Sequence, residues 1–409
     1  MKEFDVVLFG ATGFTGELVA EYLAKVNDSG EDLKWAIAGR NTQKLEQVRE
    51  RLSEINPAWS ELALVEANSN DSDSLRAMAA RAKVVCSTVG PYAKYGSPVV
   101  DACVSEGAHY CDLTGETQWI REMIDAHHET AQTKGLKIVH CCGFDSIPSD
   151  MGTYVLQQEA IARFEKPCDR ANFYVMKAKG GFSGGTVASL VNVVEEAMTD
   201  PKARKVLTDP YGLNPKDNKP SIKQRDQAGA KWAEDIQRWT GPFVMASINT
   251  RVVRRSNALM EDLYGHDFRY SESTSTGEGL KGRAAAHALA TGMGAFTGAL
   301  AVSPLRKVLV SKVLPAAGDG PDKQAREEGF FKIKIVGHLE GKPVLEAHVE
   351  GDKDPGYGYT ALMLAQSAMC LAKDKLPEGG GVLTPASAMG DALVARLRDA
   401  GMKLDVVAR

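Results

Sequence analysis

The sequence has few cysteines, little net charge and no long uninterrupted hydrophobic run, and each absence excludes a class of protein. Its seven cysteines among 409 residues form no CxxC pair, which argues against a zinc site or a disulfide scaffold. A formal net charge of −4 gives no broad attraction to nucleic acid or to an anionic membrane. We therefore expect reduced, mostly buried thiols in a cytoplasmic protein, with no metal and no nucleic-acid partner.

Two segments bear on membranes. The N-terminus enters a strand-like run directly, without the basic and apolar regions of a secretory signal. Residues 284–314 are rich in Ala, Gly, Leu and Val, but glycine and proline interrupt the longest uncharged run, 288–305. We expect a buried or substrate-lining helix pair there. A peripheral contact with a membrane or lipid is the alternative, and a homodimer also stays open.

The length and the alternation of apolar patterns predict two folded parts and a smaller appendage. In residues 1–150, short apolar runs alternate with amphipathic stretches, which predicts a doubly wound parallel sheet of the Rossmann type. Strands are expected at 4–9, 35–38, 62–65, 84–88, 110–113 and 137–142, and helices at 14–25, 72–81 and 118–133. Two further helices are expected, one capped by Thr42 and one capped by Ser97, and the second of these is expected to end at Gly107.

The pattern changes after residue 150. Residues 171–178, 247–254 and 331–336 alternate like strands, and Glu340-Gly341-Lys342 predicts a hairpin to 344–349. The polar stretch 200–231 is expected to be a surface insertion, and helices are expected near 360–373 and 387–400. We expect residues 151–350 to form an α+β domain with a mixed or antiparallel sheet for substrate binding or dimerisation, and 351–409 to form terminal helices.

A glycine-rich loop lies between the first strand and the first helix. Its spacing is GxxGxxG, in which Gly10 allows a tight turn, Gly13 a close approach of the pyrophosphate, and Gly16 close packing of helix on strand. The free N–H groups of the helix start attract phosphate. The expected cofactor-binding residues of this loop are Gly10, Thr12, Gly13, Phe14, Thr15 and Gly16.

The end of the second strand indicates which dinucleotide binds. An NAD site places a carboxylate there for the ribose 2′-hydroxyl, whereas an arginine accommodates the 2′-phosphate of NADP. This sequence has Arg40 and Asn41, with Lys44 about one turn further on. NADP(H) is therefore the expected cofactor.

The fourth strand ends in a third candidate segment, because ligands bind at the carboxyl edge of an open parallel sheet. Thr88, Val89, Gly90 and Pro91 are expected to line the cofactor. The side chains that follow, Tyr92, Lys94 and Tyr95, can then reach the nicotinamide or the substrate.

Together these segments resemble the saccharopine dehydrogenase-like oxidoreductases, which include the trans-acting enoyl reductases of actinobacterial lipid synthesis. The matching runs are GATGFTG at 10–16, AGR at 38–40, STVGPYAKYG at 87–96, YCDLTGE at 110–116, GFDSIPSD at 143–150, KGGFSGGT at 179–186, DPGYGYTA at 354–361 and GGGVLTPA at 379–386. The resemblance implies an NADP(H)-dependent oxidoreductase, a second α+β domain with a mixed sheet, and C-terminal helices that return to the first domain. The rival short-chain dehydrogenase chemistry needs a tyrosine four residues before a lysine, and no tyrosine here has one.

The proton donor is expected among residues at strand ends. Tyr92, Tyr95, Asp145 and Ser146 are the candidates we retain, with Asp112 and Glu116 nearby in the sequence. Helix capping is the alternative role for the segment after Asp145, because 148–150 also reads as a helix start. Residues 183–186 can offer N–H groups to an anionic substrate or form a simple turn.

Three functions stay open at this point. The first is a reductase of a C=C, C=N or C=O bond in a lipid-like or small metabolite. The second is a non-catalytic nucleotide-binding or lipid-surface-associated protein. The third is a saccharopine-type amino-acid dehydrogenase, which needs arginines such as Arg251, Arg254 and Arg255 directed at substrate carboxylates.

Overall fold

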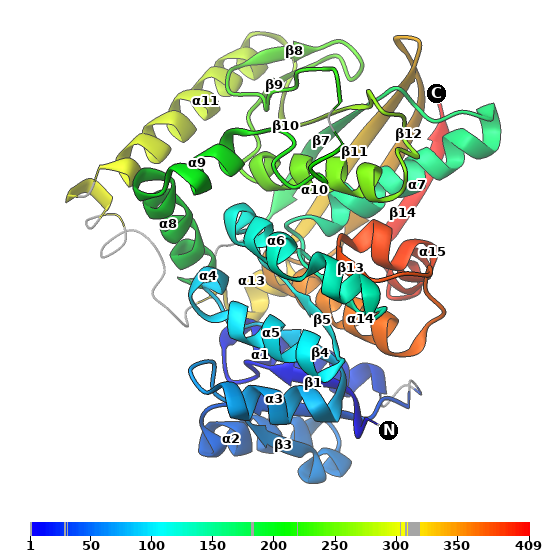
Figure 1. Ribbon diagram of the computed structural model, residues 1–409. Helices are drawn as coiled ribbons and strands as arrows, with labels where there is room; N and C mark the ends of the chain where they lie inside the picture. The colour runs from blue at the N-terminus through cyan, green and yellow to red at the C-terminus, as the bar shows by residue number, and fades with distance from the viewer. Residues whose placement is uncertain are drawn as a thin grey trace.

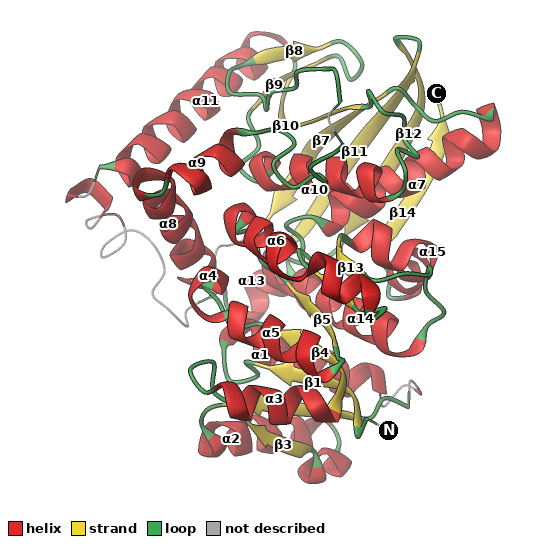
Figure 2. Ribbon diagram, in the orientation of Figure 1, coloured by secondary structure: helices red, strands yellow, loops and turns green. Residues whose placement is uncertain are grey.

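Two seven-stranded sheets form the framework of the molecule. The computed structural model describes residues 2–27, 30, 32–180, 184–218, 220–302, 304–306, 309 and 320–409. The first sheet occupies the lower part of Figure 1 and the second the upper part, with helices around and between them (Figure 1, Figure 2).

The first sheet is parallel throughout and has the order β13-β6-β5-β4-β1-β2-β3. Its strands are β1 (Phe4–Phe9), β2 (Trp35–Gly39), β3 (Ala63–Glu66), β4 (Ala82–Ser87), β5 (His109–Asp112), β6 (Lys137–Val139) and β13 (Gly381–Leu383). Its connecting helices are α1 (Phe14–Val26), α2 (Thr42–Ile55), η2 (Pro57–Glu61), α3 (Ser72–Arg81), α4 (Tyr92–Tyr95), α5 (Ser97–Glu106) and α6 (Thr117–Thr133). The predicted doubly wound parallel sheet is confirmed.

Two predicted helix caps are wrong and one is confirmed. Asn41 caps α2, because its side-chain oxygen accepts the N–H of Lys44, and Thr42 lies inside the helix. The Ser97 hydroxyl does not cap α5, because its oxygen accepts the indole N–H of Trp119 at 2.9 Å. Gly107 ends α5 in the left-handed conformation that favours glycine.

The second sheet is mixed and has the order β14-β12-β11-β7-β10-β9-β8, with a parallel β7–β10 pair among antiparallel neighbours. Its strands are β7 (Arg170–Lys179), β8 (Lys231–Ala233), β9 (Arg238–Gly241), β10 (Arg269–Gly277), β11 (Phe330–Leu339), β12 (Lys342–Gly351) and β14 (Lys403–Ala408). The predicted hairpin is confirmed, and Glu340 and Gly341 both have the positive φ of its tight turn.

Helices cover this sheet, and one of them corrects a predicted strand. They are α7 (Ile147–Phe164), α10 (Ala246–Leu259) and α11 (Gly279–Ala301), and this part of the chain also contains α8 (Gly184–Thr199), α9 (Pro201–Thr208) and α13 (Lys323–Glu327). Residues 247–254 lie in α10 and not in a strand. This helix is buried on nearly every side from Ala246 to Asn257, including its polar and charged residues, so burial does not follow the apolar pattern of its sequence.

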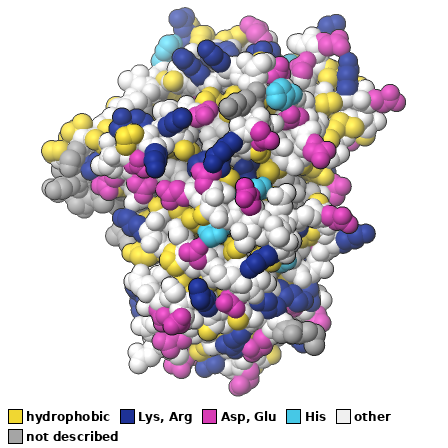
Figure 3. Space-filling model, in the orientation of Figure 1, with side chains coloured by type: hydrophobic (Ala, Val, Ile, Leu, Met, Phe, Trp, Pro, Cys, Tyr) yellow, Lys and Arg dark blue, Asp and Glu magenta, His cyan; other side chains and the backbone are white. Residues whose placement is uncertain are grey.

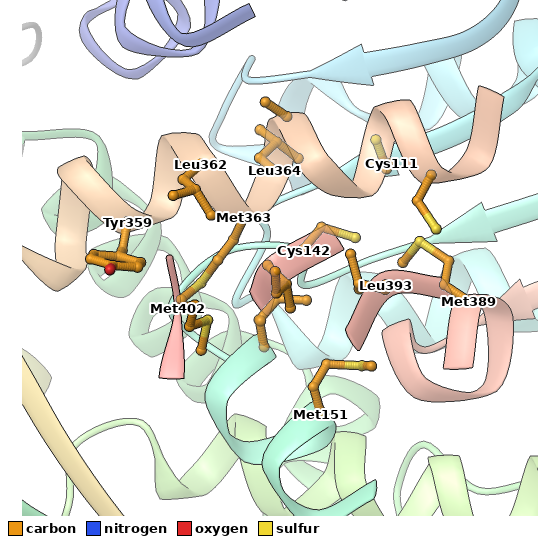
Figure 4. Close-up of a cluster of buried hydrophobic side chains, with 14 of the residues drawn as sticks. Cys111, Cys142, Met151, Tyr359, Leu362, Met363, Leu364, Met389, Leu393 and Met402 are labelled. Atoms are coloured by element: carbon orange, nitrogen blue, oxygen red, sulfur yellow. The ribbon is translucent and has the colours of Figure 1, made fainter. Parts of the chain in front are cut away.

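The C-terminal part of the chain ties the two sheets together. The turn η3 (Pro355–Tyr359) leads into α14 (Thr360–Lys373), which packs on α1, β1, β4 and β5, while α15 (Pro385–Asp399) packs on α7 and α14. Figure 4 shows Met151, Met363 and Leu393 around Cys142 in the apolar core that these helices share. The expected return of the terminal helices to the first sheet is confirmed, and β13 and β14 are strands that the sequence did not predict.

Helix α11 differs from its expected setting. Of its side chains only those of Ala286 and Leu300 are buried, apart from the position of Gly282, so the expectation of a buried helix pair is wrong for residues 284–301. The rest of the predicted segment falls largely outside the described residues. Among the described helices, none has the length and apolar character needed to cross a membrane.

Candidate active site

The glycine loop turns directly from β1 into α1. Gly10 has a φ of +92°, and a Cβ there would lie 2.7 Å from the hydroxyl of Thr88. A Cβ on Gly16 would lie 2.1 Å from the Gly10 carbonyl oxygen, so only glycine allows the helix to start this close to the strand. Gly13 stands at the N-cap and supplies no side-chain cap, which leaves first-turn N–H groups of α1 for a phosphate. This cradle fits a dinucleotide.

The other cofactor candidates lie along the same edge of the sheet. The N–H of Gly10 bonds to the Ala38 carbonyl at 2.9 Å, and Thr12 lies beside Gly39, so the Arg40 segment adjoins the glycine loop. Arg40 and Lys44 are exposed, and no described residue forms an ion pair with either of them. The side-chain oxygen of Asn41 is already engaged as the cap of α2. Two free cations therefore stand where a 2′-phosphate can bind.

The segment after β4 meets the glycine loop. The Thr88 hydroxyl donates to the carbonyl oxygens of Phe9 and Gly10 at 3.3 and 3.1 Å. Val89 is partly buried, and the Gly90–Pro91 peptide is cis. The structure thus brings together the cofactor candidates that follow β1, β2 and β4.

Glu116 holds the tyrosine segment that follows. Its carboxylate accepts the N–H groups of Tyr92 and Ala93 at 2.8 and 2.9 Å, and the hydroxyl of Ser189 on α8 at 2.9 Å. Burial raises the pKa of Glu116, and these three hydrogen bonds partly oppose the rise. Glu116 therefore joins the loop after β4 to a helix of the second part of the chain. This role was not evident from the sequence.

The two tyrosine candidates differ in their surroundings. Tyr92 is 3% exposed, its hydroxyl donates to the Ser87 carbonyl at 3.1 Å, and its ring stacks on Trp119. Burial, followed by the nearby charge of Asp112, raises the pKa of Tyr92 well above its usual value. Tyr95 is exposed on the outer side of the same short helix.

Asp112 and His140 form a buried pair at the ends of β5 and β6. One oxygen of Asp112 lies 2.7 Å from Nδ1 of His140, and the other accepts the backbone N–H groups of Thr114 and Cys141. Nε2 of His140 is buried without a hydrogen-bond partner among the described residues. Asp112 therefore holds the loops after both strands. His140 was missed because it lies inside a run that reads only as a strand, and a polar residue ending a buried strand was the one available signal.

Asp145 and Ser146 lie in a turn between β6 and α7. The Ser146 hydroxyl is buried and donates to the side-chain oxygen of Asn249 at 3.0 Å, and Ser146 makes no side-chain cap to α7. Asp145 is only partly buried, and no described residue bonds to its carboxylate. Burial raises its pKa to about 6. A carboxyl group that keeps its proton up to about pH 6 is therefore available at the sheet edge.

Other segments singled out in the sequence have different outcomes. Of residues 183–186, Ser183 lies outside the described residues and the others begin α8. Arg251, Arg254 and Arg255 are buried and donate to the carbonyl oxygens of Leu207, Pro210 and Leu213, and also to Asp226, Tyr270 and Val382. These arginines fasten the polar segment expected to be a surface insertion, and none is directed at a substrate.

The described residues contain no group of three or more His, Cys, Asp or Glu side chains that could hold a metal. All seven cysteines are free and buried. A parallel sheet with this glycine loop, joined to a mixed sheet, defines a two-part oxidoreductase that binds a nicotinamide dinucleotide.

Comparison with known proteins identifies the family. Residues 6–139 match the model of the saccharopine dehydrogenase NADP binding domain. A protein of Mycobacterium tuberculosis is 43% identical over 414 residues, covering 98% of this chain and 97% of the relative. Proteins of Mycobacterium bovis and Mycobacterium leprae, both named trans-acting enoyl reductase, are 40% and 39% identical, each over 98% of this chain and 97% of its own length.

A solved structure shares the fold. The apo saccharopine dehydrogenase (L-Glu forming) of Saccharomyces cerevisiae covers 99% of this chain and 99% of its own, with a TM-score of 0.52 and 13% identity. The chain belongs to the saccharopine dehydrogenase-like family, together with the proteins named trans-acting enoyl reductase. It is an NADP(H)-dependent oxidoreductase, and neither the non-catalytic nor the amino-acid dehydrogenase alternative is favoured.

Proposed function

We propose that the protein is an NADPH-dependent enoyl reductase that saturates an activated C=C bond in a lipid-like acyl substrate. The names of the mycobacterial relatives support this substrate class. The observation that carries the chemistry is Asp145, whose carboxyl has no partner among the described residues and a pKa raised to about 6 by burial. Such a group suits general-acid catalysis, because a general acid works best when its pKa lies near the pH at which the enzyme operates.

The candidate residues other than Asn41, whose side chain caps α2, each have a place in this proposal. The loop from Gly10 to Gly16, including Thr12, Phe14 and Thr15, binds the pyrophosphate, and Arg40 with Lys44 binds the 2′-phosphate. The segment from Thr88 to Pro91 orients the nicotinamide. When bound there, NADPH would supply the hydride needed to reduce the enoyl group.

The chain supplies the proton that completes the reduction. Asp145 donates it to the α-carbon, and its carboxylate is then reprotonated from solvent, to which the partly buried side chain has access. Ser146 and Tyr92 hold their protons on internal acceptors and are assigned to support of the site. Tyr95, at the surface, is assigned to the approach of the substrate.

A comparison of substrates tests this function. The purified protein is incubated with NADPH and a trans-2-enoyl N-acetylcysteamine thioester, a 3-oxoacyl thioester, or a cyclic imine. We expect NADPH oxidation with the enoyl thioester, matched by the saturated thioester in the mass spectrum. Turnover of the oxo compound or the imine without turnover of the enoyl thioester would assign the C=O or C=N alternative and refute the proposal.

We also propose that the exposed face of α11 contacts a lipid surface. Leu280 on this helix is 83% exposed, and no charged residue occurs from 288 to 301. The guanidinium of Arg283 lies over Trp239, which packs against Trp232. Yellow side chains mark the edge of the molecule where α11 ends (Figure 3). Apolar, aromatic and cationic side chains along a helix and beside it are typical of contacts with a bilayer interface.

Flotation with liposomes containing anionic lipid tests the contact. We expect the protein to float with the vesicles, and the double change Leu280→Glu with Ala295→Glu, two exposed positions on the same face of α11, to abolish flotation. Ile55→Glu alters an exposed apolar residue on α2 and is the matched control. If the protein stays with the free fraction and sediments as a dimer that the double change dissociates, α11 is a subunit interface and the lipid proposal fails.

A further inference from the structure

A hydrogen-bonded chain of side chains runs from Ser146 into the second sheet. The Ser146 hydroxyl donates to Oδ1 of Asn249 at 3.0 Å, and Nδ2 of Asn249 donates to Oε2 of Glu272 at 3.0 Å. The Tyr270 hydroxyl donates to Oε1 of Glu272 at 2.8 Å. The chain joins the start of α7 to α10 and then to β10.

All four members are buried, with exposed fractions of 0% for Ser146, 1% for Asn249 and Glu272, and 2% for Tyr270. Burial of a carboxyl group costs free energy that its hydrogen bonds only partly return. Burial raises the pKa of Glu272 to about 7, although hydrogen bonds from its neighbours lower it. Apolar residues of similar volume would often stabilise the fold as well or better. This buried series of hydrogen-bonded side chains therefore indicates that the turn at Ser146 must keep a defined geometry.

The same turn is fixed from a second direction. The N–H of Phe144 donates to the hydroxyl oxygen of Thr360 at 3.1 Å, and that hydroxyl donates to the Pro355 carbonyl at 3.0 Å. A Cβ on Gly143 would lie only 3.2 Å from a methyl carbon of Thr360, so the two segments are in close contact. Asp145 is the residue between these two anchors, and its carboxyl is the group that no described residue holds.

We propose that Asn249 and Glu272 are positioning residues that act through Ser146 to hold the Asp145 carboxyl at the reduction site. This inference rests on the proposed function, in which Asp145 donates the proton. Glu272 accepts from both Nδ2 of Asn249 and Tyr270, which turns Oδ1 of Asn249 toward Ser146. The Ser146 hydroxyl then fixes the turn that carries the neighbouring Asp145.

Hydrogen exchange tests the anchoring without any substrate. In the full-length protein, Asn249→Leu and Glu272→Leu are expected to raise amide exchange in a peptide spanning 143–149 by roughly tenfold or more, because an anchor of the turn is lost. Glu272→Gln retains an oxygen that can accept from Asn249 and is expected to keep exchange near the wild-type rate. Thr250→Val is the matched control, since it removes buried hydrogen bonds to Asp226 and Ala246 from the same helix without touching Ser146.

Kinetics test the consequence for the reaction. With NADPH and a trans-2-enoyl N-acetylcysteamine thioester, Asn249→Leu is expected to lower kcat by roughly tenfold to a hundredfold, while the Kd for NADPH stays unchanged. Glu272→Gln is expected to restore kcat relative to Glu272→Leu. Unchanged exchange at 143–149 in both leucine variants would overturn the positioning role. Increased exchange with no enoyl reduction by the wild-type protein would instead refute the proposed function and leave the anchoring intact.

Discussion

The hydroxyl of Tyr92 donates its hydrogen bond to the carbonyl oxygen of Ser87, 3.1 Å away, inside the same loop that carries the cis Gly90–Pro91 peptide. A tyrosine in this position braces the loop, because its proton is held by the backbone and its ring is covered by Trp119. Its raised pKa also disfavours ionisation. The group therefore contributes to the shape of the loop after β4, which we propose orients the nicotinamide.

Tyr92→Phe is accordingly expected to leave kcat within about threefold of the wild-type value and to reduce stability by about 1 kcal/mol, the usual net value of one hydrogen bond. Steady-state kinetics with NADPH and denaturant unfolding measure the two effects. A loss of kcat of a hundredfold or more at unchanged stability would instead identify Tyr92 as the proton donor.

We expect the cofactor preference to depend on Arg40. Replacing Arg40 by Asp removes a charge-assisted contact with the 2′-phosphate and adds repulsion, so the Kd for NADPH is expected to rise roughly tenfold to a hundredfold. Binding of NADH is expected to improve, because a carboxylate at this place accepts the ribose hydroxyls. Fluorescence titration with both nucleotides gives the ratio. Arg76→Ala, at an exposed site on α3, is the control, and equal affinities of the wild-type protein for both nucleotides would contradict the role of Arg40.

Gly16 is the tightest contact of the glycine loop. Gly16→Ala places a Cβ 2.1 Å from the Gly10 carbonyl oxygen and 2.9 Å from Cα of Ala11, so α1 must move away from β1. We expect a loss of about 1–3 kcal/mol of stability together with weaker NADPH binding. Gly292→Ala on α11, where no atom lies within 4 Å, is expected to stabilise the helix slightly. If both variants behave alike in thermal unfolding, the close packing at Gly16 is not limiting.

Features encoded by neighbouring residues were predictable from the sequence. The apolar run of β1, the glycines of the following turn and the arginine after β2 are each recognisable from a few neighbouring residues. The strands β1 to β6 were therefore anticipated, and the cofactor role of these segments stays a prediction. The strands β13 and β14 are different. Each is short, and each exists because it pairs with a distant strand, β6 and β12 respectively, which no local pattern reveals.

The site was predictable only in part for the same reason. Asp145 and Ser146 were chosen as candidates because they follow a strand that ends at the sheet edge. Their supports, Asn249 and Thr360, lie 103 and 216 residues away from the partners they bond, Ser146 and Phe144. Asn249 also lies in the helix whose alternating sequence resembles a strand. Long-range side-chain partners of this kind follow from the packing of the two sheets.

Asp145→Asn removes the proposed acid while keeping the shape of the side chain. We expect kcat to fall roughly a hundredfold or more, with the Kd for NADPH unchanged. In the wild-type protein the protonated fraction of Asp145 falls as pH rises through its pKa of about 6, so kcat should decline above that pH. The variant should lack this decline. A pH profile of kcat with the enoyl thioester measures both, and a variant that keeps full activity would exclude Asp145 as the donor.

Asp150 couples stability to pH. Its buried carboxyl accepts the Ser256 hydroxyl and the N–H of Ala386, and burial raises its pKa to about 7. The native state then holds a proton that the unfolded chain releases above about pH 4. The free energy of unfolding contributed by this group therefore falls as pH rises from about 4 to about 7.

His109 is expected to change the stability in the opposite direction. Burial lowers the pKa of His109 to about 4, so its contribution to the free energy of unfolding grows as pH rises toward about 6.5. Because the two effects overlap, the prediction concerns the difference between the wild-type protein and Asp150→Asn. The difference should shift in favour of the variant by roughly 1–4 kcal/mol between about pH 5 and pH 8. Urea unfolding at the two pH values measures it, with the exposed Asp217→Asn as control. A constant difference would mean that Asp150 is ionised throughout, with its two hydrogen bonds and the surrounding dipoles outweighing the cost of burial.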